Sequence, residues 1–130
     1  MCADSLVTSS TDTRIGFADK IFKNKHGWLF GMAGHAAEIR ELETLFGNDI
    51  PIGDYPKLNN TAGIVVDPTG KVYSYDDGYF TEVRAPYYAE GSGQDIVLGA
   101  FYMGATAYQA VEAAIQFDCG SGGPIQTLKL

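Results

Sequence analysis

The spacing of apolar residues changes along this chain, and the order of those changes constrains the fold more than any other feature. Polar and apolar residues alternate over residues 20–23, a turn follows at 24–27, and an apolar run occupies 28–33. This pattern predicts a hairpin whose second strand is buried. From Gly34 the apolar residues recur at helical spacing until near Gly47, which predicts an amphipathic helix.

Further strands are predicted on both sides of this region. Residues 61–66 and 71–75 flank an Asp-Pro-Thr-Gly turn, and residues 87–89 are predicted to form another short strand. Residues 1–13 are small and polar, which predicts a segment rich in turns. The stretch 47–60 contains two prolines and an Asn-Asn pair, and we interpret it as a long surface connection.

The last third of the chain changes to helical spacing. Residues 95–103 are apolar on nearly all sides, so this helix is expected to be buried on most of its faces. A second helix is predicted from Thr106, with Gln109 placed to complete a capping box. Residues 125–130 are predicted to form the final strand. Runs of strands separated from helices indicate a single α+β domain over residues 1–130, with antiparallel sheets covered by helices.

Composition limits the classes of function. Sixteen acidic residues against nine basic ones give a net charge of -7, which disfavours nucleic acid and anionic membranes as partners. No apolar run approaches the ~20 residues that span a bilayer. The first residues lack the features of a signal peptide, so a cytoplasmic location is expected. Cys2 and Cys119 form neither a disulfide framework nor a metal-ligand spacing, and we expect no metal and no cofactor.

Four short segments resemble, in order, those of proteasome β subunits and of the bacterial HslV peptidase. They are Ala-Asp-Ser at 3–5, Gly-Met-Ala-Gly-His-Ala-Ala-Glu at 31–38, Gly-Ser-Gly at 91–93 and Asp-Cys-Gly-Ser-Gly-Gly at 118–123. Lys20 lies sixteen residues after Asp4 and fourteen before Gly34, as the catalytic lysine does in that family. Each match alone is weak evidence, but four matches in the right order, of which the first three are correctly spaced, strongly support the resemblance. Together they cover nearly the whole chain.

The resemblance implies the N-terminal-nucleophile (Ntn) hydrolase fold, an αββα sandwich of two antiparallel sheets between helix layers. It also implies threonine-type endopeptidase chemistry, in which an N-terminal Thr attacks an amide carbonyl and its own α-amine accepts the hydroxyl proton. This chain departs from the family in two places. The first strand with its nucleophile is missing, and one helix is shortened within residues 47–60.

Carried over onto this sequence, the family's catalytic machinery falls on six positions. Lys20 would stabilise charge, Asp4 would orient Lys20, and a backbone N–H at Gly34 would stabilise the oxyanion. A second set would form a polar network near the nucleophile's amine: Ser92, Asp118 and Ser121. Each position also has a structural interpretation: a solvated lysine, an Asp in a turn, a glycine in a tight strand-to-helix connection, and a helix C-terminal turn.

The missing nucleophile leaves three explanations open. The native protein starts upstream at an exposed Thr, the chain is an inactive relative, or removal of Met1 exposes Cys2 as a replacement nucleophile. Thr8, Thr11 and Thr13 have no free α-amine. If the first strand is absent, an unpaired sheet edge is expected where it would lie.

By resemblance, the protein would assemble into homo-oligomeric rings, cleave extended polypeptide and work with an ATP-driven unfoldase. Two alternatives remain beside this peptidase interpretation. One is a catalytically inactive assembly or binding protein built on the same fold, and the other is a small-molecule amidase of the same superfamily.

Overall fold

The computed structural model describes residues 1–48 and 57–130 of the chain, and these residues contain three helices and nine strands. The helices are α1 (Ala36–Asn48), α2 (Gln94–Tyr102) and α3 (Ala107–Phe117). The strands are β1 (Cys2–Ala3), β2 (Leu6–Thr8), β3 (Arg14–Phe17), β4 (Ile21–Lys23), β5 (Leu29–Gly34), β6 (Thr61–Val66), β7 (Val72–Asp76), β8 (Tyr79–Glu82) and β9 (Gln126–Thr127).

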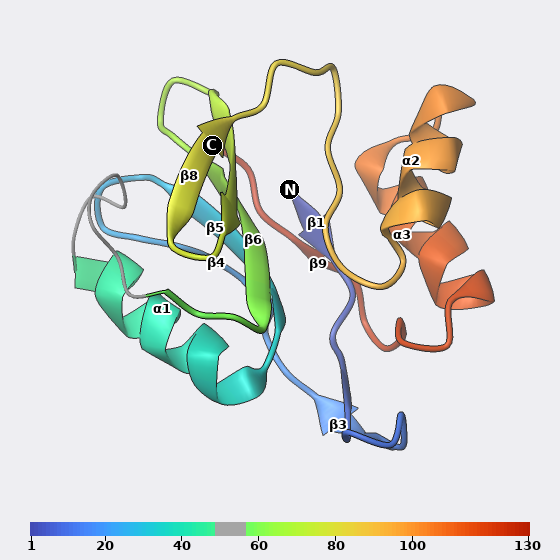
Figure 1. Cartoon of the computed structure of the whole chain (residues 1–130). Coiled ribbons are helices and arrows are strands. Elements are labelled where there is room, and N and C mark those ends of the chain that lie inside the picture. Colours follow the sequence, from blue (N-terminus) through green and yellow to red (C-terminus); the bar gives the residue numbers. More distant parts are fainter. Residues whose placement is uncertain (49–56) are drawn as a thin grey trace.

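An antiparallel sheet of five strands in the order β4-β5-β6-β7-β8 is the largest unit of the described chain. The predicted hairpin of residues 20–33 is confirmed as β4 and β5, and the second strand is largely buried. The predicted strands at 61–66 and 71–75 are confirmed as β6 and β7. Helix α1 lies across one face of this sheet (Figure 1).

The main core lies between α1 and the sheet. Phe46 of α1 is fully buried, stacks on Phe30 with ring centroids 4.8 Å apart, and meets Tyr75 edge-on at 5.9 Å. Such aromatic pairs add about 1 kcal/mol each beyond the burial of their area. The rest of the buried cluster is Leu42 of α1, Met32 of β5, Val65 of β6, and Trp28, which directly precedes β5. The apolar stripe of α1 is therefore what attaches it to the sheet.

A second, smaller layer lies on the other side of the large sheet. It contains β1 paired with β9, and α2 and α3 pack beyond it, so the layers run helix, sheet, short sheet, helices (Figure 1). Helix α3 turns Ala110, Val111 and Ala114 inward and contacts β1. The predicted capping box of Thr106 and Gln109 is confirmed at its first turn. These findings establish an α+β fold.

Several predicted elements were wrong. Residues 87–89 form no strand, and the third strand of the meander is β8, which a tight turn with positive φ at Asp77 and Gly78 joins to β7. Residues 1–13 hold two short strands, β1 and β2, where we expected a segment rich in turns, and β3 follows directly. The final strand is limited to β9. Most of the predicted connection at 47–60 lies outside the described residues, and α1 continues through Asn48.

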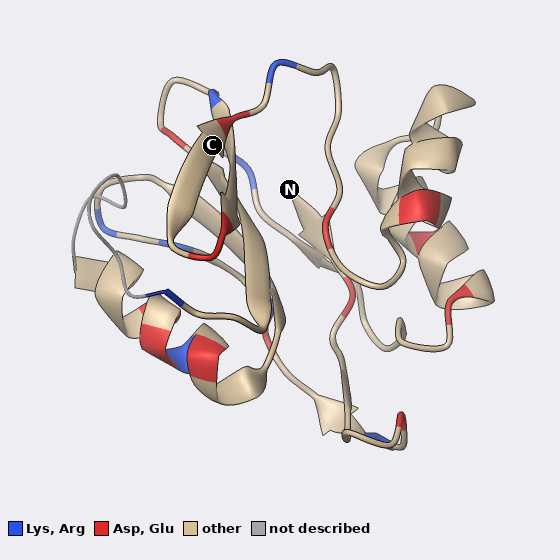
Figure 2. Cartoon of the chain, in the orientation of Figure 1, with Lys and Arg blue, Asp and Glu red and all other residues tan. Residues whose placement is uncertain are grey.

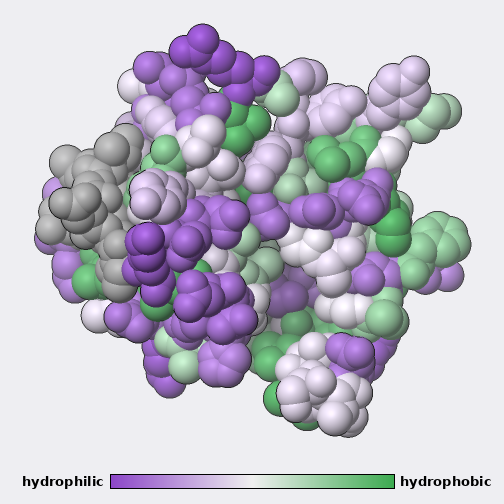
Figure 3. Space-filling model, in the orientation of Figure 1, coloured by the Kyte–Doolittle hydropathy of each residue, from purple (hydrophilic) through white to green (hydrophobic). Residues whose placement is uncertain are grey.

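Helix α2 also differs from prediction, because none of its residues is buried. It packs mainly against α3, and Tyr87 stacks on its Phe101 with ring centroids 5.1 Å apart. Tyr102 and the following Met103 are 80% and 82% exposed, and Phe117 at the end of α3 is 77% exposed. Apolar and weakly polar residues gather over this helix pair (Figure 3), whereas α1 carries a dense set of charges (Figure 2). Within the described chain, no helix is long and apolar enough to cross a membrane.

Replacing Phe46 by leucine should lower the free energy of unfolding by about 1–2 kcal/mol, because the ring loses its partners and leaves a partial cavity. The same substitution at Phe17, which is 65% exposed, should change it by no more than about 0.5 kcal/mol. Urea unfolding followed by fluorescence measures both values. Equal losses in the two variants would mean that the aromatic stack does not hold α1 to the sheet.

Candidate functional site

Asp4 and Lys20 form an ion pair between two segments that each adjoin a short strand. Asp4 directly follows β1, Lys20 directly precedes β4, and the Lys20 Nζ lies 2.7 Å from Asp4 Oδ1. The Lys20 side chain is only 24% exposed and the Asp4 side chain only 15%. Asp4 Oδ2 accepts hydrogen bonds from the backbone N–H groups of Leu6, at 3.2 Å, and Gly122, at 2.9 Å. One cation and two amides thus fix this carboxylate.

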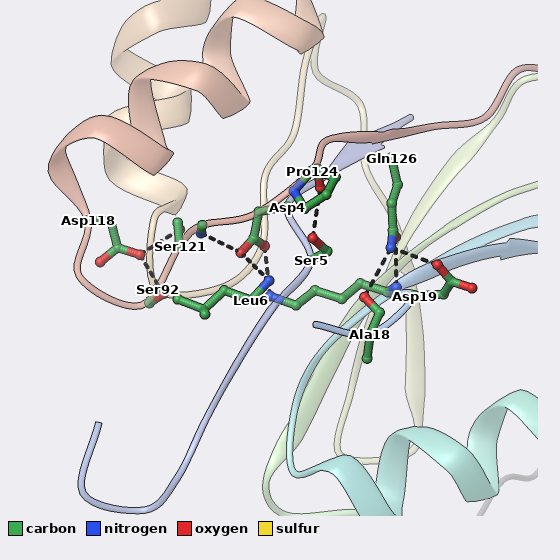
Figure 4. A network of polar contacts seen from close by, with 12 residues as sticks. Asp4, Ser5, Leu6, Ala18, Asp19, Ser92, Asp118, Ser121, Pro124 and Gln126 are labelled. Carbon is green, nitrogen blue, oxygen red and sulfur yellow. Dashed lines mark hydrogen bonds and ion pairs between the residues drawn. The ribbon is translucent and has the colours of Figure 1, made fainter. Parts of the chain in front are cut away.

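A second carboxylate is held by two hydroxyls. Ser92 and Ser121 both donate to Asp118 Oδ2, each at 2.7 Å. Asp118 is the residue at the C-terminal cap of α3, Ser92 lies in the loop that precedes α2, and Ser121 lies in the turn after α3. The close pair of helices therefore places all three side chains together (Figure 4).

The two carboxylates belong to one cluster. Gly122, whose N–H binds Asp4, directly follows Ser121, whose hydroxyl binds Asp118. The Lys20 charge also acts on Asp118 and lowers the pKa of its carboxyl. The fold thus brings five of the predicted side chains into one polar region: Asp4, Lys20, Ser92, Asp118 and Ser121. Figure 4 shows Asp4, Ser92, Asp118 and Ser121 in this region.

The pKa of Asp118 reflects opposing effects. Burial is the largest single influence and raises it, but the hydrogen bonds from Ser121 and Ser92, the Gly120 N–H and the Lys20 charge together outweigh burial. The net result is a pKa below the ordinary value of 3.8. Asp118 is therefore ionised at neutral pH and serves as a hydrogen-bond acceptor.

Gly34 is the last residue of β5, and a single residue separates it from the start of α1 at Ala36. Its φ of 133° is unfavourable for other residues, and a Cβ there would collide with the backbone of Asn60 and Thr61. A Cβ on Gly91 would be 3.4 Å from that of Ala33, so the Gly-Ser-Gly loop lies beside this end of β5. Gly34 thus neighbours the loop of Ser92, and its conformation also meets a packing requirement.

Close packing explains a second glycine of the predicted segments. A Cβ on Gly93 would lie 2.9 Å from the Cβ of Ala114 and 3.0 Å from Ser121 Oγ. The loop before α2 can approach α3 and its C-terminal turn only because residue 93 has no side chain. This approach is what places Ser92 within hydrogen-bond distance of Asp118.

Gln126 of β9 is a site residue that sequence analysis missed. Its Oε1 accepts from the Lys20 backbone N–H at 2.8 Å, and its Nε2 donates to Ala18 O at 3.0 Å and Asp19 Oδ1 at 2.9 Å. The amide thereby fixes the backbone that carries Lys20 (Figure 4). No local pattern marks a glutamine that bonds across more than a hundred residues.

The two cysteines lie outside this polar cluster. Cys2 Sγ lies 3.5 Å from Thr127 Oγ1 on β9, and within the described residues it makes no hydrogen bond with the five clustered side chains. Cys119 is exposed. Among residues 1–48 and 57–130, no group of three or more His, Cys, Asp or Glu side chains is placed to hold a metal ion.

Comparison with known proteins gives a structural likeness without a sequence match. No protein-family model matches the chain, and no curated protein matches it in sequence. Among the solved structures with a similar fold are Thiobacillus denitrificans BPH in complex with epoxomicin, at 18% identity and a TM-score of 0.75, and Thiobacillus denitrificans BPH, at 19% and 0.76. Each likeness covers 96% of this chain and 88% of the other. At these identities the likeness shows the shared fold.

Replacing Asp118 by asparagine should make stability less dependent on pH. A carboxyl whose pKa is lowered on folding stabilises the protein above its unfolded value, and that contribution disappears as the pH falls through the folded pKa. The variant should therefore be less stable than the wild type at pH 6, and the difference should shrink below pH 3.8. Urea unfolding at several pH values tests this. A difference that stays constant over that range would contradict an ionised, hydrogen-bonded Asp118.

Proposed function

We propose that the chain is a subunit of a proteasome-like or HslV-like threonine-type endopeptidase. The observation that carries this proposal is the polar cluster around Lys20. Three of the four segments that the family resemblance singled out, which are distant in sequence, supply four of the clustered side chains, and Lys20 supplies the fifth. Spacing in the sequence alone does not require such convergence, so it supports the resemblance independently.

The arrangement suits amide hydrolysis by an N-terminal nucleophile. A hydroxyl nucleophile is weak until a base takes its proton, and an α-amine titrates near neutral pH, where it can do so. The Lys20 ammonium, oriented by Asp4, would stabilise developing negative charge and keep a nearby amine unprotonated. The carboxylate of Asp118, with the hydroxyls of Ser92 and Ser121, would hold the amine in place. A backbone N–H at Gly34 would receive the oxyanion.

The layer order supports assignment to the Ntn-hydrolase αββα sandwich. Helix α1, the five-stranded sheet, the β1–β9 pair and the α2–α3 pair follow one another through the molecule (Figure 1). One structural neighbour binds epoxomicin. We use this compound as a probe for the proposed activity.

The nucleophile itself would lie on a strand beside β1. One edge of β1 pairs with β9, and within the described residues no strand pairs with the other edge. An unpaired strand edge accepts another strand readily. We propose that a strand beginning with the nucleophilic Thr occupies this edge in the active protein, which would bring the Thr towards Lys20.

Protein isolated from its native locus should begin with an exposed Thr, by N-terminal sequencing and intact mass, and should hydrolyse a fluorogenic peptide. Epoxomicin should inhibit the reaction. Lys20→Ala should lower kcat at least about 100-fold with a smaller effect on KM, because its charge acts mainly in the transition state.

Lys23→Ala is the matched control, since Lys23 is an exposed lysine of β4 outside the cluster, and it should leave kcat unchanged. A native N-terminus at Met1 or Cys2 without hydrolysis would refute the peptidase. That outcome would favour the catalytically inactive assembly protein.

We also propose that the protein is a homo-oligomer, of the ring type, and that the outer face of α2 and α3 is a contact between subunits. A helix as apolar as α2 is normally buried, yet here it has no buried residue, and Tyr102, Met103 and Phe117 of the helix pair are strongly exposed. An extended polypeptide as substrate and an ATP-driven unfoldase as partner belong to the same proposal.

Changing Tyr102 and Met103 together to serine should shift the protein from oligomer to monomer, because the substitution removes apolar area from the contact. Multi-angle light scattering after gel filtration measures the mass. Tyr79→Ser on β8 is the control, because Tyr79 is similarly exposed at 63% but lies on the large sheet. Unchanged masses in all variants would show that subunits do not meet through α2 and α3.

A further inference from the structure

A pocket of about 350 Å³ lies next to the Lys20 cluster and plays no part in the mechanism above. It is lined by Ser5, Phe17, Ala18, Asp19, Pro124 and Gln126. Ser5 and Asp19 are the chain neighbours of Asp4 and Lys20, and Gln126 binds the Lys20 backbone, so pocket and cluster share a wall. Figure 4 shows Ser5, Ala18, Asp19, Pro124 and Gln126 beside the cluster.

The pocket is built by hydrogen bonds between distant segments. Ser5 Oγ donates to Pro124 O at 2.8 Å, which ties the start of the chain to its end. Gln126 Nε2 donates both to Ala18 O and to Asp19 Oδ1. These bonds fix the relative positions of three walls, so the shape of the pocket depends on the fold rather than on one mobile side chain.

The same bonds determine which chemistry the pocket can recognise. The single hydroxyl proton of Ser5 and both amide protons of Gln126 are already donated. The lining side chains therefore have no spare donor for a carboxylate or a carbonyl. Asp19 is the opposite case: within the described residues, Oδ2 of its carboxylate has neither a hydrogen bond nor an ion pair.

An aromatic ring stands at the rim. Phe17 is 65% exposed, and within the described residues no other ring stacks on it. A carboxylate and an uncovered aromatic face together attract an organic cation, the first by charge and the second by its quadrupole. The net charge of -7 favours approach of a cation over that of an anion.

We propose that this pocket is a subsite for a basic side chain, arginine or lysine, of a bound extended polypeptide. The ammonium or guanidinium binds Asp19, and the aliphatic part lies against Phe17. Because the pocket adjoins the Lys20 cluster, it would give the proposed peptidase a preference for basic residues near the cleaved bond. The inference about substrate class rests on that proposed function, but binding to the pocket does not.

Titration of the isotope-labelled chain with acetyl-Ala-Arg-Ala-amide, followed by NMR, tests the subsite without any need for catalysis. The matched probe is acetyl-Ala-citrulline-Ala-amide, which has nearly the same shape as the arginine peptide but no charge. The arginine peptide should shift the signals of residues 17–19 and 126 and bind at least about fivefold more tightly than the citrulline peptide.

Two variants separate the proposed contacts. Asp19→Asn keeps an oxygen to accept the Gln126 bond but removes the charge, so the two peptides should then bind equally. Phe17→Leu should weaken binding of the arginine peptide about threefold, through loss of the ring face. Asp12→Asn is the control, because Asp12 is an exposed carboxylate of the β2–β3 connection outside the pocket, and Asn tolerates its positive φ.

Three results would each overturn the subsite. The wild type could bind the two peptides with equal affinity, the NMR shifts could map to another surface, or Asp19→Asn could keep the preference for the arginine peptide. Shifts of the same residues on raising the protein concentration without peptide would instead assign the pocket to a second copy of the chain, which also overturns it. A failed peptidase assay together with a positive titration would leave the subsite standing and reject only the proposed reaction.

Discussion

The carboxylate of Asp4 joins segments of the structure that are far apart in the sequence. It holds the Lys20 ammonium through one oxygen and the N–H groups of Leu6 and Gly122 through the other, so it connects β1, the start of β4 and the turn after α3. A partly buried ion pair of this kind adds modestly to stability, but loss of Asp4 leaves the Lys20 charge and two amides without their partner. The pair therefore has its main value in fixing where these segments meet.

The candidate site was more predictable from the sequence than its surroundings were. Asp4, Lys20 and the Gly-Ser-Gly segment were singled out because short segments of the sequence and their spacing resemble those of a known family. Gln126 has no such local signal: its three hydrogen bonds reach residues 106 to 108 positions away, and only the completed fold reveals them. The β1–β9 pair is missed for a related reason, since two-residue strands are too short to show a period of two.

The errors over the helices and strands also have physical causes. The pattern of apolar residues predicts which faces of α2 can be buried, but it does not predict whether residues of the same chain bury them. In this structure, no residue of α2 is buried. The aromatic pair of residues 87–88 resembles a strand in composition, yet among residues 1–48 and 57–130 the segment pairs with no strand. In contrast, α1, β5 and β6 were predicted well because each has one buried face within the chain itself.

The pairing of β1 with β9 has a consequence for the order in which the molecule is completed. The Met1 amine donates to Leu128 O, and the Leu128 N–H donates back to Met1 O, across nearly the whole chain. Contacts between such distant residues form late, because closing long loops costs entropy before any gain is realised. During synthesis, Asp4 and Lys20 would lack these hydrogen-bond partners until Gly122 and Gln126 emerge from the ribosome. The polar cluster would thus be assembled only after residue 126 has been synthesised, so a shorter nascent chain would not present it.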